Sequence, residues 1–271
     1  MLQRSPTYVV SRPAEDAVAN ALRRFLPPRL AYGLARWKNV LLGMVFYQMC
    51  KRRPDKVRRM ILDGVRHELG PGYDVDRDFA PRYAPWDQRL CLVPDGDLFR
   101  AIRDGRVSVV TDEIDRFTAT GLRLASGRTL EADLVVTATG LELQLMGGMA
   151  VTVDGRPVDP GQAVTYKGMM YSDVPNLAVV SGYTNASWTL KADLVCEHVC
   201  RLLNHMRRKG LRQCVARLDD PSMERLPSID FSSGYIRRAL HRLPKQGTRP
   251  PWRLHQNYAR DLLGLRYGAV T

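Results

Sequence analysis

The stretch Leu130–Leu141, LEADLVVTATGL, decides the fold that this sequence predicts. Its centre, Leu134–Val136, is a short apolar run of mainly β-branched residues, which is typical of a buried central strand. The Thr-Ala-Thr-Gly that follows predicts a tight turn, because Gly140 lets the backbone approach closely whatever lies beyond the strand. Open α/β sheets bind ligands at this end of their strands, so we expect an α/β fold with a ligand site here. The alternative is an ordinary strand and turn.

The composition is that of a globular protein with an excess of positive charge. The 271 residues are 45% hydrophobic and 25% charged, which excludes a disordered chain and allows one or two domains. Lys and Arg number 41 against 28 Asp and Glu, a net charge of +13. Such a charge suits an anionic partner: a phosphorylated cofactor, a nucleic acid or an anionic membrane surface. The arginines are spread along the chain without a nucleic-acid-binding motif, so we expect no nucleic-acid partner.

The cysteines indicate a reducing compartment. They are odd in number and scattered, and no signal peptide precedes them, so we expect a cytoplasmic protein. On a predicted helix, Cys196 and Cys200 share a face from which His198 departs, so we expect no metal site there. We expect buried or half-buried thiols at Cys50, Cys91, Cys196, Cys200 and Cys214.

The region Ala14–Leu69 is predicted to be helical, with a break at Pro27-Pro28 and an end at Gly70-Pro71-Gly72. Its middle helix begins at Leu30 and contains the apolar run VLLGMVFYQMC, which is too short to span a bilayer. We expect this helix to be buried. The alternative is peripheral membrane contact, because Lys38 and the Lys-Arg-Arg run that starts at Lys51 flank the apolar residues.

Strands are expected in the remainder of the chain. Val107–Thr111 predicts one strand, and Ile114–Leu130 predicts a short β-meander. Leu177–Val180 predicts a buried strand, Gly182 a turn at its end, and the residues after Asn185 a helix that stops at Gly210. A strand, a glycine turn and a helix N-terminus together form a site for an anion or the edge of a flavin, although a capped amphipathic helix has the same pattern.

Three stretches carry a resemblance to a known family. The first, LQRSPTYVVSRPAED, starts at Leu2 and resembles the segment after the second strand of the NADPH domain in class B flavoprotein monooxygenases. This class contains the Baeyer–Villiger and the flavin-containing monooxygenases. The resemblance implies that Arg4 and Ser5 hold the 2′-phosphate of NADPH. An arginine at the end of a strand suits a phosphate, and the alternative for Arg4 is a solvated surface charge.

The second stretch is Phe79–Phe99, FAPRYAPWDQRLCLVPDGDLF, in which prolines and aromatic residues predict an irregular ordered loop. It resembles the linker that crosses the nicotinamide site of Baeyer–Villiger enzymes and carries a basic pair. The alignment places Gln88 at the first position, where the family usually has Lys, and Arg89 at the second. The resemblance implies that Gln88 lies near the cofactor and that Arg89 is catalytic, as the cation that stabilises the flavin peroxide. A salt bridge to Asp87 or Asp97 is the alternative for Arg89.

The third stretch is SDVPNLAVVSGYTNASWTLKAD, which begins at Ser172. It resembles the family segment that brings a helix onto the isoalloxazine ring of FAD. The resemblance implies cofactor contacts by Gly182, Asn185 and Ser187. It implies a substrate pocket lined by Tyr183, Thr184, Trp188 and Leu190.

The opening stretch matches the family as well. Ala138, Thr139 and Gly140 correspond to the Ala-Thr-Gly signature at the crossing from the NADPH domain to the FAD domain, and they imply further cofactor contacts. The resemblance thus implies a partial NADPH-binding domain in residues 1–140, with a helical insertion at about residues 14–78. Residues 141–271 would be the C-terminal part of the FAD domain and a tail.

The resemblance implies an α/β fold that is part of a flavoprotein with two dinucleotide-binding domains: a Rossmann-like NADPH-domain remnant with a helical insertion, and the C-terminal part of the FAD domain. The family uses FAD and NADPH. It transfers one oxygen atom from O₂ into a ketone, or onto a soft sulfur or nitrogen centre, through a flavin C4a-peroxide.

The glycine-rich loops of the family are missing from this sequence, whose only Gly-x-Gly is Gly70-Pro71-Gly72. We therefore expect a C-terminal fragment of such a monooxygenase, with the N-terminal half supplied elsewhere. The alternatives are an inactive truncated remnant and a basic module that binds a membrane or a nucleic acid.

Overall fold

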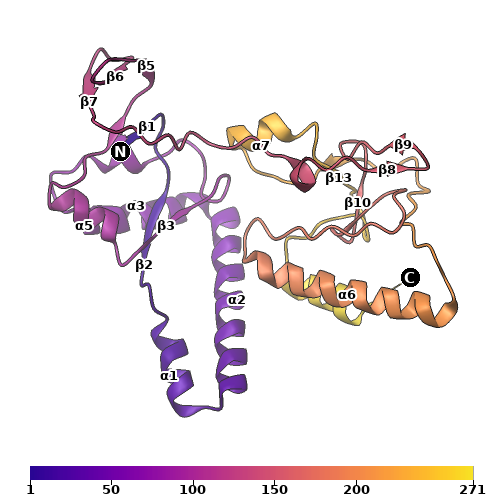
Figure 1. Cartoon of the computed structure of the whole chain (residues 1–271). Coiled ribbons are helices and arrows are strands. Elements are labelled where there is room, and N and C mark those ends of the chain that lie inside the picture. The colour runs from indigo at the N-terminus through magenta and orange to yellow at the C-terminus, as the bar shows by residue number, and fades with distance from the viewer. Residues whose placement is uncertain (271) are drawn as a thin grey trace. The chain divides into compact units, whose positions relative to one another are not determined.

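The computed structural model describes residues 1–270, which fall into two compact units, Met1–Thr139 and Gly140–Thr271 (Figure 1). The first unit contains two parallel strand pairs. β1 (Leu2–Gln3) pairs with β4 (Val110–Thr111), and β2 (Val9–Arg12) pairs with β3 (Cys91–Pro94). Parallel neighbours need a crossover between them, and helices supply most of that connection here.

The helices of the first unit follow the sequence signals closely. They are α1 (Ala17–Phe25), α2 (Pro28–Arg52), α3 (Pro54–Leu69), α4 (Val75–Phe79) and α5 (Asp97–Arg103). A proline occupies the first turn of both α2 and α3, where a missing N–H costs nothing. Gly70 ends α3 with a φ of 78°. The predicted helical region and its breaks are therefore confirmed.

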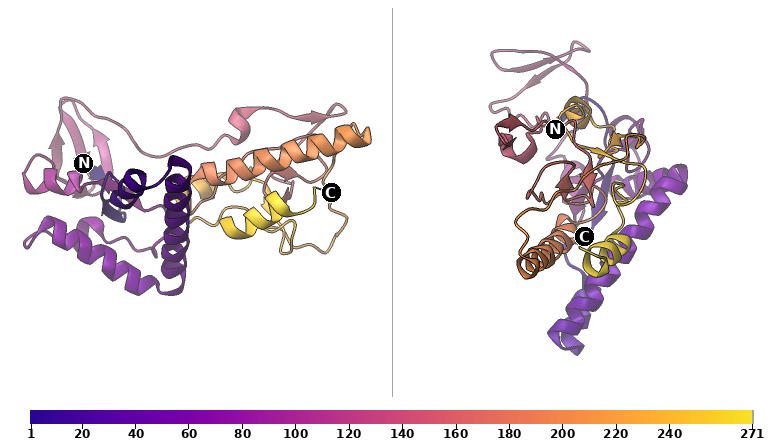
Figure 2. Two further views of the ribbon diagram at one scale, coloured as in Figure 1. Left: turned by 90° about the horizontal axis from the view of Figure 1, so that it is seen from below. Right: turned by 90° about the vertical axis from the view of Figure 1, so that its right-hand side faces the viewer.

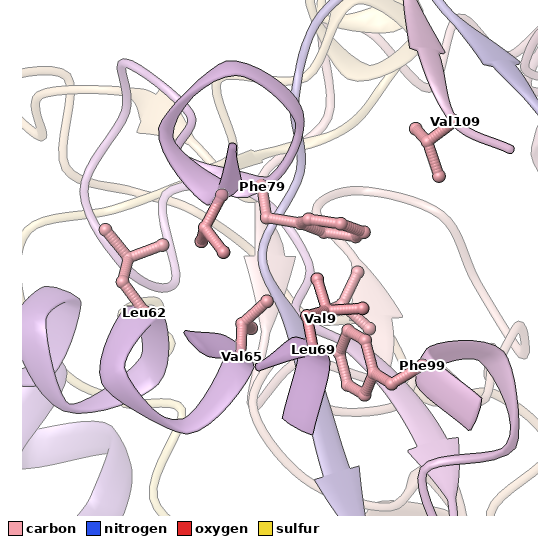
Figure 3. Packing of buried hydrophobic residues seen from close by; sticks show 8 residues of the cluster. Val9, Leu62, Val65, Leu69, Phe79, Phe99 and Val109 are labelled. Atoms are coloured by element: carbon pink, nitrogen blue, oxygen red, sulfur yellow. The ribbon is translucent and has the colours of Figure 1, made fainter. Parts of the chain in front are cut away.

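Helix α3 positions the core of the first unit. One face of it is buried, through Val57, Ile61, Leu62, Val65 and Leu69. The larger cluster joins this face to β2, α4 and α5, and Figure 3 labels Val9, Leu62, Val65, Leu69, Phe79, Phe99 and Val109 in it. The rings of Phe79 and Phe99 meet edge to face at 5.8 Å. Each side chain of this kind contributes about 1.5–3 kcal/mol when fully buried, so this cluster holds the parallel strands in place.

Helix α2 is not the buried helix that its apolar run predicts. It buries only Ala31, Val40 and Cys50, and α1 buries none of its residues. Within the described residues, α2 packs against α1 and α3 alone among the helices and strands, which leaves the rest of its surface to solvent. The α1–α2 hairpin extends away from the remainder of the first unit (Figure 1).

The stretch Phe79–Phe99 is more regular than its composition predicts. Residues 80–90 are irregular, as expected, but β3 and the start of α5 lie within the stretch. The prolines are concentrated before residue 86, and Cys91–Pro94 is free to pair with β2. The expectation of a continuous loop is therefore wrong over its second half.

The β-meander is confirmed. It consists of β5 (Ile114–Phe117), β6 (Gly121–Leu124) and β7 (Thr129–Glu131), all antiparallel. At the turn, Gly127 N–H donates to Leu124 O at 2.9 Å. Gly121 is required because a Cβ there would lie 2.0 Å from Leu130 O.

Two predicted strands do not form. Leu134–Val136 is extended without a strand partner, and Leu134 and Val136 are 80% and 81% exposed. Leu177–Val180 also forms no strand, although Val179 N–H donates to Met169 O at 2.7 Å. A buried strand needs neighbours on both edges and a cover on both faces. The part of the chain that the structure describes supplies none of these around residues 134–136, so the predicted burial is wrong.

The second unit is built on the long helix α6 (Trp188–Lys209), which ends at Gly210 as predicted. Helix α8 (Tyr258–Asp261) and the π-helical turn Leu262–Tyr267 lie along it (Figure 2). The short antiparallel pairs are β8 (Thr152–Val153) with β9 (Arg156–Pro157), β10 (Thr165–Tyr166) with β11 (Met170–Tyr171), and β12 (Leu226–Pro227) with β13 (Lys245–Gln246). Helix α7 (Gly234–Ala239) and a 3₁₀ turn, Leu145–Gly148, complete the unit.

The thiols differ in exposure. Cys50 is buried and Cys214 half-buried, as expected, whereas Cys91, Cys196 and Cys200 are exposed. Cys196 and Cys200 stand on the solvent face of α6 because Val195, His198 and Leu202 turn inward instead.

Candidate functional site

Arg4 and Ser5 follow β1 directly and are exposed in the bend that leads to β2. The strand before them is anchored by the side chain of Gln3. Its amide Nε2 donates to Thr111 Oγ1 at 2.8 Å and to the backbone oxygen of Asp78 at 2.6 Å. The position from which the Arg4 loop departs is therefore fixed by side chains of β4 and α4.

A buried carboxylate holds this anchor together. Asp78 is fully buried and accepts hydrogen bonds from Tyr73 Oη at 2.9 Å, Thr111 Oγ1 at 2.8 Å and Arg77 Nη2 at 2.8 Å. Burial by itself would raise the pKa of Asp78, but the hydrogen bonds from these three partners outweigh it and hold the pKa below its ordinary value. Burial and the Asp78 carboxylate raise the pKa of Tyr73 to about 12. Asp78 is thus a charged structural pin beneath the Arg4 loop.

Gln88 and Arg89 leave a turn that is fixed to the helices. Trp86, whose φ is 72°, packs edge to face on Phe46 of α2 at 6.0 Å. Asp87 accepts an ion pair from Lys51 Nζ at 2.9 Å. After this turn Gln88 is half-buried and Arg89 is exposed, two residues before β3 begins.

The two predicted cofactor segments meet at one edge of the β2–β3 pair. These strands are parallel and start in register, with Val9 opposite Cys91. Cys91 N–H donates to Tyr8 O at 2.9 Å, so the chain enters both strands at the same place. The Arg4–Ser5 loop enters β2 there, and Gln88–Arg89 enters β3. The fold therefore brings two guanidinium-bearing loops together from distant parts of the first unit.

This edge can bind an anion. An arginine guanidinium is always charged and presents a planar fork of donors that matches a phosphate, and the hydroxyl of Ser5 adds a further donor. The residues present fit a phosphorylated nucleotide in the first unit. Among the described residues there is no group of three or more His, Cys, Asp or Glu side chains that could hold a metal ion.

In the second unit, Tyr183 leads the loop before α6. Its ring is buried, and its hydroxyl donates to Asp261 Oδ2 at 2.6 Å. Lys191, only 5% exposed, donates to the same oxygen at 2.8 Å. Burial, followed by the Asp261 carboxylate, raises the pKa of Tyr183. The three side chains form a buried cluster that locks the loop onto α8.

The next residues of the loop are held by Gln256. Thr184 N–H donates to Gln256 Oε1 at 3.0 Å, and Asn185 Nδ2 donates to Gln256 O at 2.9 Å. Both the backbone and the side chains of the predicted cofactor segment are thus engaged with the C-terminal segment. Asn185 is occupied in a structural contact through its amide nitrogen, and its Oδ1 faces no partner that restricts it in the described hydrogen bonds.

The start of α6 is shaped by Gly182 and Trp188. A Cβ at Gly182 would lie 2.1 Å from Trp188 Cγ, so only glycine admits the indole there. Gly182 has no positive φ, and its role is this close approach and not the turn that the sequence predicts. Ser187 Oγ lies 2.8 Å from Thr189 Oγ1, and both are exposed at the helix N-terminus, whereas Leu190 is buried. An exposed helix N-terminus with two hydroxyls and an indole can contact the edge of a ring cofactor.

Ala138, Thr139 and Gly140 are exposed and belong to no strand. Gly140 has a φ of 113°, a conformation that favours glycine. The structure brings together Gly182, Tyr183, Thr184, Asn185, Ser187, Trp188 and Leu190 in the second unit, and Arg4, Ser5, Gln88 and Arg89 in the first.

Three residues that position the second cluster were not predicted: Lys191, Gln256 and Asp261. Lys191 stands within the SWTLKAD motif, and its place one turn after Ser187 was the available signal. Gln256 and Asp261 lie some seventy residues further on, as their contacts with Thr184 and Lys191 show, and no local pattern marks them.

Comparisons with known proteins agree with the arrangement. No family model matches the chain. The chain is 56% identical to the FAD-containing monooxygenase EthA of Mycobacterium tuberculosis over 270 residues, which are 100% of this chain and 55% of EthA. It is 46% identical to the probable FAD-binding monooxygenase AlmA of Acinetobacter baylyi over 98% of this chain and 53% of AlmA. The chain therefore spans about half the length of the curated relatives it matches.

Two solved structures are similar in fold. An oxidized steroid monooxygenase bound to NADP matches 77% of this chain and 48% of its own, with a TM-score of 0.58 and 18% identity. OTEMO in complex with FAD and NADP matches 77% of this chain and 47% of its own, with a TM-score of 0.52 and 14% identity. These matches confirm the predicted fold class, a partial α/β fold of the flavin monooxygenase type. With the sequence identities above, they show that the chain belongs to the family of FAD-containing monooxygenases.

Proposed function

We propose that the chain supplies the NADPH-binding and flavin-facing parts of an FAD- and NADPH-dependent monooxygenase. The reaction inserts one oxygen atom of O₂ into a ketone or adds it to a soft sulfur or nitrogen centre. The observation that carries the proposal is the meeting of the Arg4–Ser5 and Gln88–Arg89 segments at one edge of the β2–β3 pair. The names of the relatives, FAD-containing or FAD-binding monooxygenases, support it.

In this proposal, residues 1–140 are the partial NADPH-binding domain and its helical insertion. Arg4 and Ser5 bind the 2′-phosphate of NADPH, and Gln88 contributes a neutral hydrogen-bonding side chain beside it. The Asp78 network keeps the Arg4 loop in position without itself touching the coenzyme. Because the guanidinium fork is charged and nearly preorganised, Arg4 is the residue that distinguishes NADPH from NADH.

Arg89 is the proposed catalytic residue. FAD, reduced by NADPH, supplies the chemistry that activates O₂. Arg89 would hold a fixed positive charge beside the oxygen on which negative charge develops, and its guanidinium cannot lose its proton at neutral pH. The pinned turn at Trp86 and Asp87 limits the positions from which Arg89 can reach the oxygen.

Residues 141–271 would face the flavin ring and the substrate. Gly182, Asn185 and Ser187, with the Ala138–Gly140 segment, contact the cofactor in this proposal. Thr184 and Trp188 border the substrate, while Tyr183 and Leu190 support that border from inside the unit, where they are buried. The chain contains no Gly-x-Gly-x-x-Gly loop, so we assign it no role toward the FAD pyrophosphate.

The proposal is tested by coenzyme affinity. The 271-residue chain, with FAD supplied, is titrated with NADPH and with NADH, and tryptophan fluorescence reports binding. We expect tighter binding of NADPH, and we expect Arg4→Ala to weaken NADPH binding about tenfold while leaving NADH unchanged. Arg12→Ala is the matched control, because Arg12 is exposed at the opposite end of β2.

Three results would contradict the proposal: no binding of NADPH by the unsubstituted chain, an equal loss of both coenzymes in Arg4→Ala, or an equal effect of Arg12→Ala. An equal loss of both coenzymes would point to a change in the fold of the Arg4 loop and away from a phosphate contact.

A further inference from the structure

Helix α2 carries an apolar stripe on its exposed surface. Leu30, Leu34, Trp37, Leu41 and Val45 follow one another at intervals of three or four residues, so they lie on one face of the helix. All five are 42–57% exposed, and Phe25, at the end of α1, is 77% exposed. Single exposed apolar residues are ordinary, but an aligned series of this length marks a surface that binds something.

The charge around the stripe is of one sign. Residues 17–54 contain no Asp or Glu, and their basic residues are Arg23, Arg24, Arg29, Arg36, Lys38, Lys51, Arg52 and Arg53. Two of these cations pair with carboxylates from outside the hairpin: Lys38 with Asp16 at 2.5 Å and Lys51 with Asp87 at 2.9 Å. The hairpin itself offers no carboxylate, so its own field is positive throughout.

The position of the stripe lets it meet a flat surface. The α1–α2 hairpin extends away from the rest of the first unit, and the Leu26–Pro27 turn forms its tip (Figures 1 and 2). Arg24 at this tip lies over the ring of Phe25 at 5.8 Å. Basic and aromatic residues together at the end of an amphipathic element suit the boundary between lipid headgroups and acyl chains.

We propose that the α1–α2 hairpin binds the surface of an anionic membrane, with the stripe of α2 and Phe25 in the headgroup boundary and the arginines on the phosphates. The charge complementarity decides for this occupant. A second copy of the chain would bring another acid-free basic hairpin against the first, which like-charge repulsion disfavours. No helix in the described residues is long and apolar enough to cross a membrane, so the hairpin would lie on the surface.

The test is co-sedimentation of the full 271-residue chain with vesicles of phosphatidylcholine alone and of phosphatidylcholine with 30% phosphatidylglycerol, a composition of roughly physiological charge. We expect binding to the anionic vesicles only. The stripe variant Leu30→Ser/Leu34→Ser/Leu41→Ser should lose about tenfold or more of the binding. The matched control is Leu203→Ser/Leu263→Ser, two leucines of the second unit that are equally exposed.

A second variant addresses charge without touching the apolar stripe. Arg23→Gln/Arg24→Gln should weaken vesicle binding about fivefold for each arginine removed, and added salt should weaken the unsubstituted chain in the same direction. In the unsubstituted chain, lipids with brominated acyl chains should quench the part of the fluorescence that Trp37→Phe removes. This measurement keeps the test decisive if the stripe variant fails to fold.

Equal binding to neutral vesicles, binding that survives the stripe variant, or no quenching of Trp37 would overturn the proposal. A dimer that forms without lipid and disappears in the stripe variant, with no vesicle binding, would also overturn it and identify a second copy as the occupant. Sedimentation velocity measures that outcome.

Discussion

At the scale of single residues, Asp78 is the most constrained charge in the first unit. Its carboxylate is fully buried and accepts hydrogen bonds from Tyr73, Arg77 and Thr111. Loss of one partner in such a network leaves other buried groups unsatisfied, which costs more than the bond itself contributes. The carboxylate therefore stabilises the site indirectly, by holding the end of β1 from which Arg4 departs.

We expect Asp78→Asn to lower the free energy of unfolding by about 2–4 kcal/mol at pH 7, because the amide cannot accept from all three donors. The folded-state pKa of Asp78 lies below its ordinary value of 3.8, so its stabilising contribution is present above that value and is lost as the pH falls through the folded-state pKa. Urea denaturation at pH 7 and at pH 3 should show the difference between the two proteins shrinking at the lower pH.

The control for this substitution is Asp76→Asn on the same helix. Asp76 pairs with Arg66 at 3.0 Å, but its side chain is 71% exposed, so the change should cost about 0.5 kcal/mol or less. A cost for Asp78→Asn that equals this control, or that grows on acidification, would contradict the role of Asp78 as a buried anion.

At the scale of elements, the helices were predictable and two strands were not. A helix satisfies its backbone internally, so the proline breaks and glycine ends around α2, α3 and α6 were enough to place them. A strand depends on a neighbour. Leu134–Val136 has the composition of a central strand but no partner in the described residues, and its local sequence cannot show that.

The candidate site divides in the same way. Arg4 and Arg89 could be named from their motifs, but their common edge comes from the pairing of Val9 with Cys91, which no local pattern records. Asp261 escaped prediction because its partners Tyr183 and Lys191 are distant in sequence. The exposure of α2 was also missed, since an apolar run has the same composition whether a neighbour covers it or not.

The contact between α6 and α8 yields a prediction at this scale. Asp261→Asn removes the carboxylate that pairs with the buried Lys191, and an unpaired buried ammonium should cost about 3 kcal/mol of unfolding free energy. Lys191→Met/Asp261→Asn removes both charges and should cost less than Asp261→Asn alone. Denaturant unfolding of the two single variants and the double variant measures the coupling. Additive effects of the two substitutions would argue against a direct buried pair.

At the scale of the whole molecule, residues 131–140 join the two units as an exposed segment. Proteases cut exposed chain that lacks backbone pairing far sooner than helices or strands. We expect limited digestion with thermolysin, which cleaves before Leu and Val, to cut first near Leu134–Val136 and to give two fragments of roughly half the mass each. Mass spectrometry identifies the site. First cuts inside α3 or α6 would show that these helices open more readily than the joining segment.

The register of β2 with β3 has a consequence for the order in which this protein matures. Helices assemble from neighbours in sequence and form early, whereas a pairing between remote parallel segments must wait until the intervening chain has been gathered in. The edge that unites Arg4 with Arg89 is such a pairing. Anion affinity should therefore appear after the helical signal during refolding and vanish before it during denaturation. A preparation with full helicity has not, on that ground, acquired a complete cationic edge.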